Sequence, residues 1–327
     1  MTASDFAQDL VAPFGPRVPI DTLVVELNRL YHSFEATDYD NTHPEVHEQL
    51  PPFWSQMIQT VMSDSKNKAW NVLDFGCGTG FEAGQILEKL GPSRIRSLTC
   101  YDPSPEMLER CRVKIGSRMA SVRFCTKLDE VMNVSEPYDL VATNSLLHHL
   151  PSAGGIVRQL EPAISKDAWW LMGHEPSGRF YRNDECFRAF NRYQRGVRWR
   201  KLASPRACCR SLQRLLRLGD YPAESTANAA FKEGLFAKLP SASAIARLVD
   251  FNVPHSAQEA TGGRGFDFED MGSDLTSVWQ LRWVRSYAFM GSFAENRLPA
   301  KWRSISERLG AKHPLDGANF CSVWSHK

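Results

Sequence analysis

The chain has 327 residues, of which 43% are hydrophobic and 11% are aromatic, so it can bury a sizeable core. At roughly 100–200 residues per domain, it is longer than one minimal nucleotide-binding unit. The 39 basic and 37 acidic side chains give a formal charge of +2, which provides no chain-wide basic field for nucleic acid. These values exclude disordered and fibrous classes and predict a globular protein without a nucleic-acid partner.

Cysteine spacing and hydropathy predict the compartment in which the protein is found. The eight cysteines form no C-x-x-C pair and have no Cys/His spacing typical of zinc, so we expect no metal site. Several, such as Cys100, lie in apolar segments that suit reduced thiols in the cytoplasm. Residues 1–10 are polar and acidic, unlike a signal peptide, and no apolar run approaches the ~18 residues of a bilayer span. We therefore expect neither secretion nor membrane insertion.

The first sixty residues read as an arm followed by two helices. Pro13, Pro16 and Pro19 predict an irregular arm over residues 1–20. Apolar residues at helical spacing predict helices within 21–31 and 54–62. The polar segment 35–44 between them reads as a functional loop, because it combines three acids with a tyrosine and a histidine.

Strands and helices alternate in the next hundred residues. The predicted strands are 71–75, 95–101, 122–125, 138–143 and 168–173, and the predicted helices between them include 83–90, 105–115 and 156–164. Ser104 is placed to cap the second of these helices. Such alternation implies βαβ crossovers and therefore an α/β fold with a doubly wound, mostly parallel sheet.

The alternation ends after residue 176. Helices are predicted at 184–218 and 241–250, a Gly-rich link at 261–266, strands at 279–289 and 319–324, and a helix at 301–309. The sequence thus predicts four regions. They are an N-terminal arm and helical lid (1–66), a nucleotide-binding core (67–176), a helical substrate cap inserted after strand five (177–260), and C-terminal strands that complete the core sheet (261–327).

The most specific motif is the Gly-rich turn between the first strand and the next helix. Read from Gly78, it fits the dinucleotide pattern Gly78-x-Gly80-x-x-Ala83, with Asp102 as the ribose acid. Read from Asp74, it is acid-x-Gly-x-Gly-x-Gly, which resembles motif I of the class I S-adenosylmethionine (SAM) dependent methyltransferases. A carboxylate would be repelled by a pyrophosphate, whereas SAM carries an ammonium and a sulfonium, so the second interpretation is favoured.

Two further segments support this resemblance to small-molecule methyltransferases. The segment 101–108 looks like the motif whose acid, here Asp102, takes both ribose hydroxyls, and 137–151 is similar to the strand-four segment that runs along the methyl donor. The resemblance implies a Rossmann-like fold with SAM as cofactor. The residues that it places at the cofactor are Asp74, Gly76, Cys77, Gly78, Gly80, Asp102, Pro103, Met107, Asn144 and Ser145, with Tyr31 and Tyr39 from the lid. The adenine contact stays open between Asp129 and Thr126.

The chemistry is expected at the carboxyl ends of strands four and five, where ligands bind in doubly wound sheets. The candidate catalytic residues there are Asn144, His148, His149, His174, Glu175 and Tyr181. A hydroxyl or protonated amine acceptor must lose a proton, and imidazole has a suitable pKa near neutrality. The alternative is that one of His148 and His149 only caps a helix or packs, and that Glu175 only anchors the cap.

The basic side chains concentrate in one place, since eleven arginines lie between residues 174 and 218. Their spacing predicts a helix with an apolar face and a basic face, such as Arg188, Arg192 and Arg195. The basic face is either simply solvated or recognises an anionic acceptor, including one bound to an acidic carrier protein. The sequence leaves a homodimer open.

Three functions remain after this reading. The leading one is methyl transfer from SAM to a small acceptor of secondary metabolism. The second is a SAM cyclase, in which the cofactor's own amine attacks its γ-carbon and releases methylthioadenosine and azetidine-2-carboxylate. The positions of Asn144 and Tyr181 look similar to the layout of such cyclases. The third is a SAM-binding partner or regulator without turnover.

Overall fold

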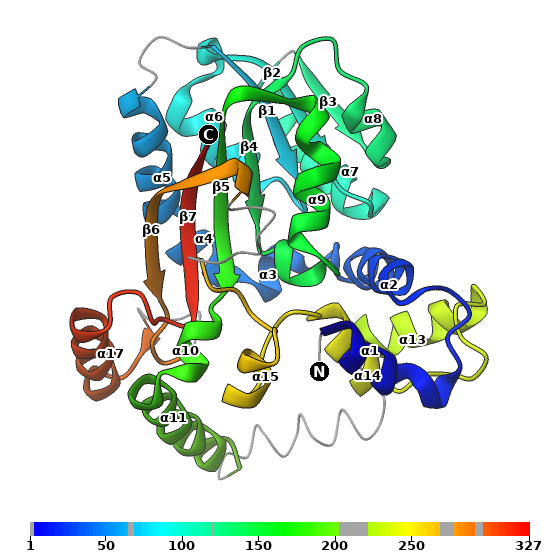
Figure 1. Ribbon diagram of the computed structural model, residues 1–327, viewed down its shortest axis with the longest axis vertical. Coiled ribbons are helices and arrows are strands. Elements are labelled where there is room, and N and C mark those ends of the chain that lie inside the picture. The colour runs from blue at the N-terminus through cyan, green and yellow to red at the C-terminus, as the bar shows by residue number, and fades with distance from the viewer. Residues whose placement is uncertain (1–2, 65–68, 120, 203–221, 269–276, 292–296) are drawn as a thin grey trace.

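The protein is described by a computed structural model that covers residues 3–64, 69–119, 121–202, 222–268, 277–291 and 297–327 (Figure 1). Within these ranges it forms one seven-stranded sheet with the strand order β3-β2-β1-β4-β5-β7-β6. The strands are β1 (Trp70–Phe75), β2 (Ile95–Tyr101), β3 (Val122–Cys125), β4 (Tyr138–Asn144), β5 (Ile164–Pro176), β6 (Trp279–Tyr287) and β7 (Asn319–His326).

The sheet confirms the predicted doubly wound, mostly parallel α/β fold. β1 to β5 pair in parallel, and β7 runs antiparallel between β5 and β6. The strand order reverses between β1 and β4, so the connections after these two strands leave in opposite directions. In such sheets a crevice opens at this switch point, outside the carboxyl ends of the strands.

Helices cover both faces of the sheet. The helices are α1 (Ala3–Val11), α2 (Ile20–Glu35), α3 (Tyr39–Thr42), α4 (Pro44–Gln49), α5 (Pro51–Asp64), α6 (Phe81–Leu90), α7 (Pro105–Ile115), α8 (Leu128–Met132), α9 (Ala153–Leu160), α10 (Gly178–Arg182), α11 (Asp184–Leu202), α13 (Pro222–Lys232), α14 (Ala242–Val249), α15 (Ala257–Thr261) and α17 (Ala300–Lys312). Short 3-10 turns lie at η1 (Ala12–Phe14), η2 (Pro92–Arg94), η3 (Leu147–His149) and η4 (Glu161–Ala163).

The sheet separates two apolar clusters, because successive residues of a strand point to opposite faces. Val72 packs into the cluster formed with α5, α6 and α7, whereas the next residue, Leu73, packs into the opposite cluster with α8 and α9. All six residues of β1 are buried, as expected for a central strand covered on both faces. The sheet edge that carries the crevice is therefore held rigidly from both sides.

Four helices from two distant parts of the chain form a separate unit, which we call the helical roof. It consists of α1 and α2 from the predicted lid and of α13 and α14 from the predicted cap, which share one buried apolar cluster. Figure 1 shows these helices grouped together beyond the lower end of the sheet. The lid and the cap thus pack on each other as well as on the core.

Two local predictions at the N-terminal end were wrong. Residues 3–11 form helix α1 and not an irregular arm, because all three prolines lie after Val11 and because Ala7 and Val11 bury one helical face. The segment 35–44 is not a simple loop either, since it contains α3 and the start of α4.

Two boundaries also differ. β5 continues to Pro176, so His174 and Glu175 lie inside the strand and not after it. The predicted helix 184–218 is seen as α11 up to Leu202, and its later arginines at 206, 210, 214 and 217 lie outside the described residues. Within the described ranges, none of the helices combines the length and the apolar character that a bilayer span requires.

We expect the helical roof to depend on the packing of α2. Leu27 is fully buried there, so Leu27→Ala should lower the free energy of unfolding by about 2–5 kcal/mol through lost contacts and a cavity. Phe34 lies on the same helix with 48% of its surface exposed, so Phe34→Ala should cost about 1 kcal/mol or less. Urea denaturation of both variants measures the difference, and equal losses would contradict this packing.

Candidate active site

Two adjoining pockets lie at the carboxyl ends of the central strands. The first, which we call the glycine-loop pocket, is a cavity of about 100 Å³ between the turn after β1, the start of the segment after β2 and helix α2. The second, which we call the histidine pocket, is a cavity of about 270 Å³ between η3, α2 and α14. The residues that line both pockets are His32, Tyr39, Val46, Ser145 and His149.

The structure brings most of the predicted residues to these pockets. The predicted residues at the glycine-loop pocket are Tyr39, Gly76, Cys77, Gly78, Asp102, Pro103, Met107, Asn144, Ser145 and His149. Those at the histidine pocket are Tyr31, Tyr39, Ser145, His148, His149 and His174. Asp74, Gly80, Glu175 and Tyr181 line neither pocket.

The turn after β1 is built to leave space beside its backbone. Gly78 has φ 47, and a Cβ atom added there would meet no heavy atom within 4 Å, so the turn faces open space. Its amide donates to Oδ2 of Asp102 at 2.9 Å, which ties the turn to the end of β2. Asp74 lies beneath the turn, where its Oδ2 accepts the amide of Ala83 at 3.0 Å in the first turn of α6. Asp74 therefore positions the loop from behind.

The glycine-loop pocket is electrostatically prepared for a cationic ligand. Burial raises the pKa of Asp102 to about 6, even though it accepts the amides of Gly78 and Ser104. Burial also raises the pKa of Glu82 well above its usual value, and the neighbouring Asp74 raises it further. Glu82 and Asp102 both line the pocket. A ligand with an ammonium and a sulfonium would favour their ionised forms, so the donor set fits SAM.

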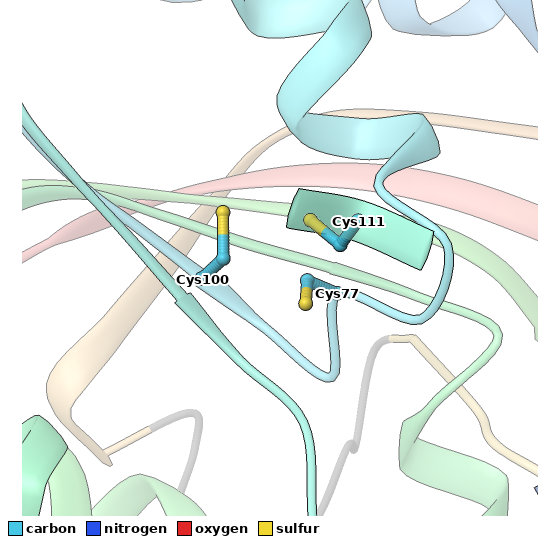
Figure 2. Close-up of side chains that lie close together, drawn as sticks. All are labelled: Cys77, Cys100 and Cys111. Atoms are coloured by element: carbon cyan, nitrogen blue, oxygen red, sulfur yellow. The ribbon is translucent and has the colours of Figure 1, made fainter. Parts of the chain in front are cut away.

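Three cysteines that are distant in sequence meet under the same turn. The sulfur atoms of Cys77, Cys100 and Cys111 lie within 4.8 Å of one another, as Figure 2 shows for their side chains. All three are buried, and burial is the main cause that raises the pKa of the Cys77 thiol. A Cβ atom at Gly80 would lie 2.9 Å from the Cys111 sulfur, so this packing requires glycine there. The spacing of the cysteines gave no sign of this contact.

A buried carboxylate organises the wall shared by the two pockets. Glu175 is fully buried, and its Oε1 accepts the amides of Leu146 and Leu147 at 3.0 and 2.9 Å. Its Oε2 accepts the amide of His148 at 3.2 Å and pairs with Nδ1 of the same histidine at 2.9 Å. Because a carboxylate only accepts, Nδ1 carries the proton and the lone pair remains on Nε2 of His148.

The other two predicted histidines are weaker proton acceptors than His148. Nδ1 of His149 donates to the carbonyl of Val249 at 2.7 Å, which leaves Nε2 as its lone-pair nitrogen, but burial lowers its pKa well below the usual value. His174 pairs through Nδ1 with the hydroxyl of Tyr287 and through Nε2 with Asn319 at 3.4 Å, and burial lowers its pKa to about 3. Burial also opposes the charged form of His148, yet its pairing with Glu175 raises its pKa, so His148 is the better candidate.

The backbone is strained at this wall. Ser145 has φ 51 and His174 has φ 55, and both line the histidine pocket. Positive φ angles cost non-glycine residues of order 1–3 kcal/mol and concentrate at functional sites. The strain lies directly after β4 and within β5, where the surrounding sheet holds both residues in place.

Several pocket residues could not be named from the sequence. His32 and Glu35 on α2 line the histidine pocket, and Glu35 pairs with His32 at 3.3 Å and with His43 at 3.2 Å. These pairs lower the pKa of Glu35 to about 2 despite its burial. The sequence signal that could have pointed to His32 was its position directly after Tyr31, which was predicted to lie at the cofactor. Asp250 follows α14 and also lines the pocket, but no local pattern marked it.

Tyr181 lies away from the cleft. It belongs to α10, where its ring contacts Phe180 and Phe187 at centroid distances of 5.2 and 5.4 Å. The prediction that Tyr181 faces the reacting atoms therefore has no support in its packing. The prediction rests on a strand five that ends at residue 173, whereas β5 continues to Pro176 and Tyr181 lines neither pocket.

Comparison with known proteins finds relatives of the core. A family model described as a methyltransferase domain matches residues 73–169. A malonyl-[acyl-carrier protein] O-methyltransferase of Acetivibrio thermocellus is 27% identical over 150 residues, which are 45% of this chain and 49% of that protein. Malonyl-[acyl-carrier protein] O-methyltransferase 1 of Ilyobacter polytropus is 29% identical over 124 residues, which are 37% and 42%. The chain thus spans about half the length of the curated relatives it matches.

Residues 73–169 thus resemble a methyltransferase domain. This match agrees with the class I SAM-dependent methyltransferase resemblance and with SAM as the cofactor that the motifs predict. Among solved structures, the plantazolicin methyltransferase BpumL in complex with SAH aligns with a TM-score of 0.48 at 13% identity, over 94% of this chain and 97% of that one.

We expect Asp102 to decide the affinity for SAM. Asp102→Asn keeps the size of the side chain but removes the charge and one acceptor oxygen, so the Kd of SAM should rise about 10- to 100-fold. Isothermal titration calorimetry measures this change. Asp21→Asn is a matched control, because Asp21 is exposed in the first turn of α2 and lines neither pocket. An unchanged Kd for Asp102→Asn would contradict the placement of the cofactor.

The raised pKa of Asp102, about 6, also predicts a pH dependence of SAM binding. The carboxylate is mostly ionised at pH 7 and mostly protonated at pH 5, and only the ionised form offers both oxygens as acceptors. The affinity of the free protein for SAM should therefore fall about tenfold between pH 7 and pH 5. The SAM affinity of Asp102→Asn, measured over the same pH range, should lack this tenfold fall. An equal fall in both proteins would refute the assignment of the pH dependence to Asp102.

Proposed function

We propose that this protein transfers the methyl group of SAM to a small acceptor bound in the histidine pocket. The observation that carries the proposal is the common wall of the two pockets, which includes Ser145 and His149. A donor in one pocket and an acceptor in the other would face each other across this wall. Such proximity is what an in-line displacement needs.

The glycine-loop pocket would bind and orient the cofactor. We assign Asp102 to the ribose hydroxyls, because each of its oxygens accepts one amide and keeps a second lone-pair direction. Glu82 and the ring of Tyr39 would lie near the positive centres, where a carboxylate and an aromatic face are both favourable. When bound, SAM supplies an electrophilic methyl group on a sulfonium.

The histidine pocket would hold the nucleophile of the acceptor. The lone pair of the acceptor forms the bond to the methyl carbon, the carbon–sulfur bond breaks, and the sulfur keeps its electron pair. An acceptor hydroxyl must also lose its proton in this process. The pocket offers Nε2 lone pairs on His148 and His149, held in position by Glu175 and the Val249 carbonyl. Ser145, on the common wall, lies between the two sites.

The acceptor itself is proposed to be a small acidic metabolite, free or attached to a carrier protein. The relatives named above are O-methyltransferases of a malonyl group on an acyl carrier protein, which supports this class. The exposed side chains of Arg188, Arg192 and Arg195 on α11 support an anionic partner as well. These side chains make no ion pair with other described residues.

The cyclase alternative receives less support from the geometry. It was based on Asn144 together with Tyr181, and Tyr181 packs outside both pockets. Asn144 does line the glycine-loop pocket, but its Oδ1 accepts Nε1 of Trp54 at 3.3 Å. We therefore keep methyl transfer as the proposed reaction.

Mass spectrometry of SAM incubations tests the proposal. We expect S-adenosylhomocysteine and a methylated product when SAM is combined with a panel of carboxylic acids and hydroxy acids, each free and as its acyl-carrier-protein thioester. The Asp102→Asn variant should form the same products with a raised KM for SAM. Methylthioadenosine without any acceptor would instead indicate the intramolecular reaction. Tight SAM binding with unchanged SAM throughout would indicate a partner or regulator without turnover.

A further inference from the structure

The histidine pocket contains a group of side chains that the proposed reaction does not fully use. His148 and His149 come from η3 after β4, and Asp250 comes from the end of α14. One ligand atom from each of the three lies within 4.8 Å of the others. Ligand atoms around a tetrahedral Zn²⁺ are about 3.4 Å apart, so small side-chain rotations would bring the three onto one cation.

The two imidazoles are oriented as metal ligands usually are. Each is tied through Nδ1 to an acceptor outside the cluster, namely Oε2 of Glu175 at 2.9 Å and the carbonyl of Val249 at 2.7 Å. Histidine ligands of metals generally donate their other N–H to a carboxylate or a backbone carbonyl in this way. The tautomer is thereby fixed, and Nε2 of both His148 and His149 is the nitrogen left for a cation.

Asp250 supplies the third donor. Its carboxylate makes no hydrogen bond or ion pair with the described part of the chain, although it is half-buried in the wall of the pocket. A partly buried carboxylate without a partner is costly unless a cation or water satisfies it. The guanidinium of Arg264 lies nearby and donates to the backbone carbonyl of Asp250 at 3.1 Å, but it makes no ion pair with the carboxylate, whose oxygens stay available to a cation.

The cluster is held together without the cation. The amide of Asn252 donates to the His148 carbonyl at 2.8 Å, and its side chain donates to the Leu150 carbonyl at 2.8 Å. Together with the bond from His149 to Val249, these contacts fix the segment after α14 against η3. A cation would thus enter a site that is already assembled, which reduces the cost of ordering.

We propose that His148, His149 and Asp250 form a binding site for a divalent first-row transition metal ion such as Mn²⁺ or Zn²⁺. Two imidazoles and one carboxylate leave further coordination positions open, and all three side chains line the histidine pocket. A cation there would occupy the Nε2 lone pairs of the histidines and would replace them in promoting proton loss, because it would polarise an acceptor oxygen. This role rests on the proposed function, whereas the binding of the ion does not. The proposal departs from the expectation, based on cysteine and histidine spacing, that the chain has no metal site.

Metal binding is measured on the tag-free full chain, stripped with a chelator, with neither SAM nor acceptor present. We expect one equivalent of Mn²⁺ or Zn²⁺ by calorimetry and by elemental analysis after gel filtration. Co²⁺ should give visible absorption bands of a low-symmetry site. Asp250→Asn is nearly isosteric and should weaken binding about tenfold or more. His149→Gln should do the same.

His47→Gln is the matched control, because His47 pairs with Asp40 and does not line the histidine pocket. It should bind the metal like the parent. The Kd of SAM for Asp250→Asn should be unchanged, which shows that this variant folds. The proposal is overturned if the parent binds no more metal than Asp250→Asn, or if His47→Gln loses as much. Production of S-adenosylhomocysteine by a chain that binds no metal would end the metal proposal and keep the methyltransferase proposal. Metal binding by a chain that shows no turnover would keep the metal proposal and end the methyltransferase proposal.

Discussion

The site depends on one buried carboxylate. Glu175 has no exposed surface and receives four donors, three of them successive amides from Leu146 to His148. An ionised carboxylate at this depth is tolerable only because charge-assisted hydrogen bonds replace its water. The segment after β4 would otherwise be a short loop with unsatisfied amides. Because this segment forms the wall between the two pockets, the relation of the two pockets is set from inside β5.

The helical roof attaches to this same segment. Asn28 from α2 donates to the His149 carbonyl at 3.2 Å, and Asn252, just after α14, donates to the carbonyls of His148 and Leu150. Two parts of the chain that are far apart in sequence therefore bind to neighbouring carbonyls of three consecutive residues. The roof cannot shift as a unit without breaking these bonds, so the shape of the histidine pocket is coupled to the packing among the four roof helices.

The sequence predicted the cofactor half of the site much better than the acceptor half. The turn from Asp74 to Gly80 and the acid Asp102 are local signals, because a tight turn and the end of a strand need particular residues at fixed spacing. The histidine pocket has no such local basis. His32 and Asp250 are brought together by α2 and α14, which lie more than 200 residues apart in the sequence, and Tyr181 lines neither pocket because β5 ends later than predicted. Tertiary packing decides these positions, and a spacing pattern does not encode it.

The two pockets also differ in charge in a way that separates their ligands. Buried carboxyls, Glu82 and Asp102, line the glycine-loop pocket, and burial raises the pKa of both. Imidazoles dominate the histidine pocket, where the Nε2 lone pairs of His148 and His149 can bind a proton or a metal ion. With the proposed metal ion bound, a cationic cofactor would be favoured on one side of the common wall and disfavoured on the other. In the proposed reaction, an acceptor in the histidine pocket would then meet the methyl donor across this wall, as an in-line transfer requires.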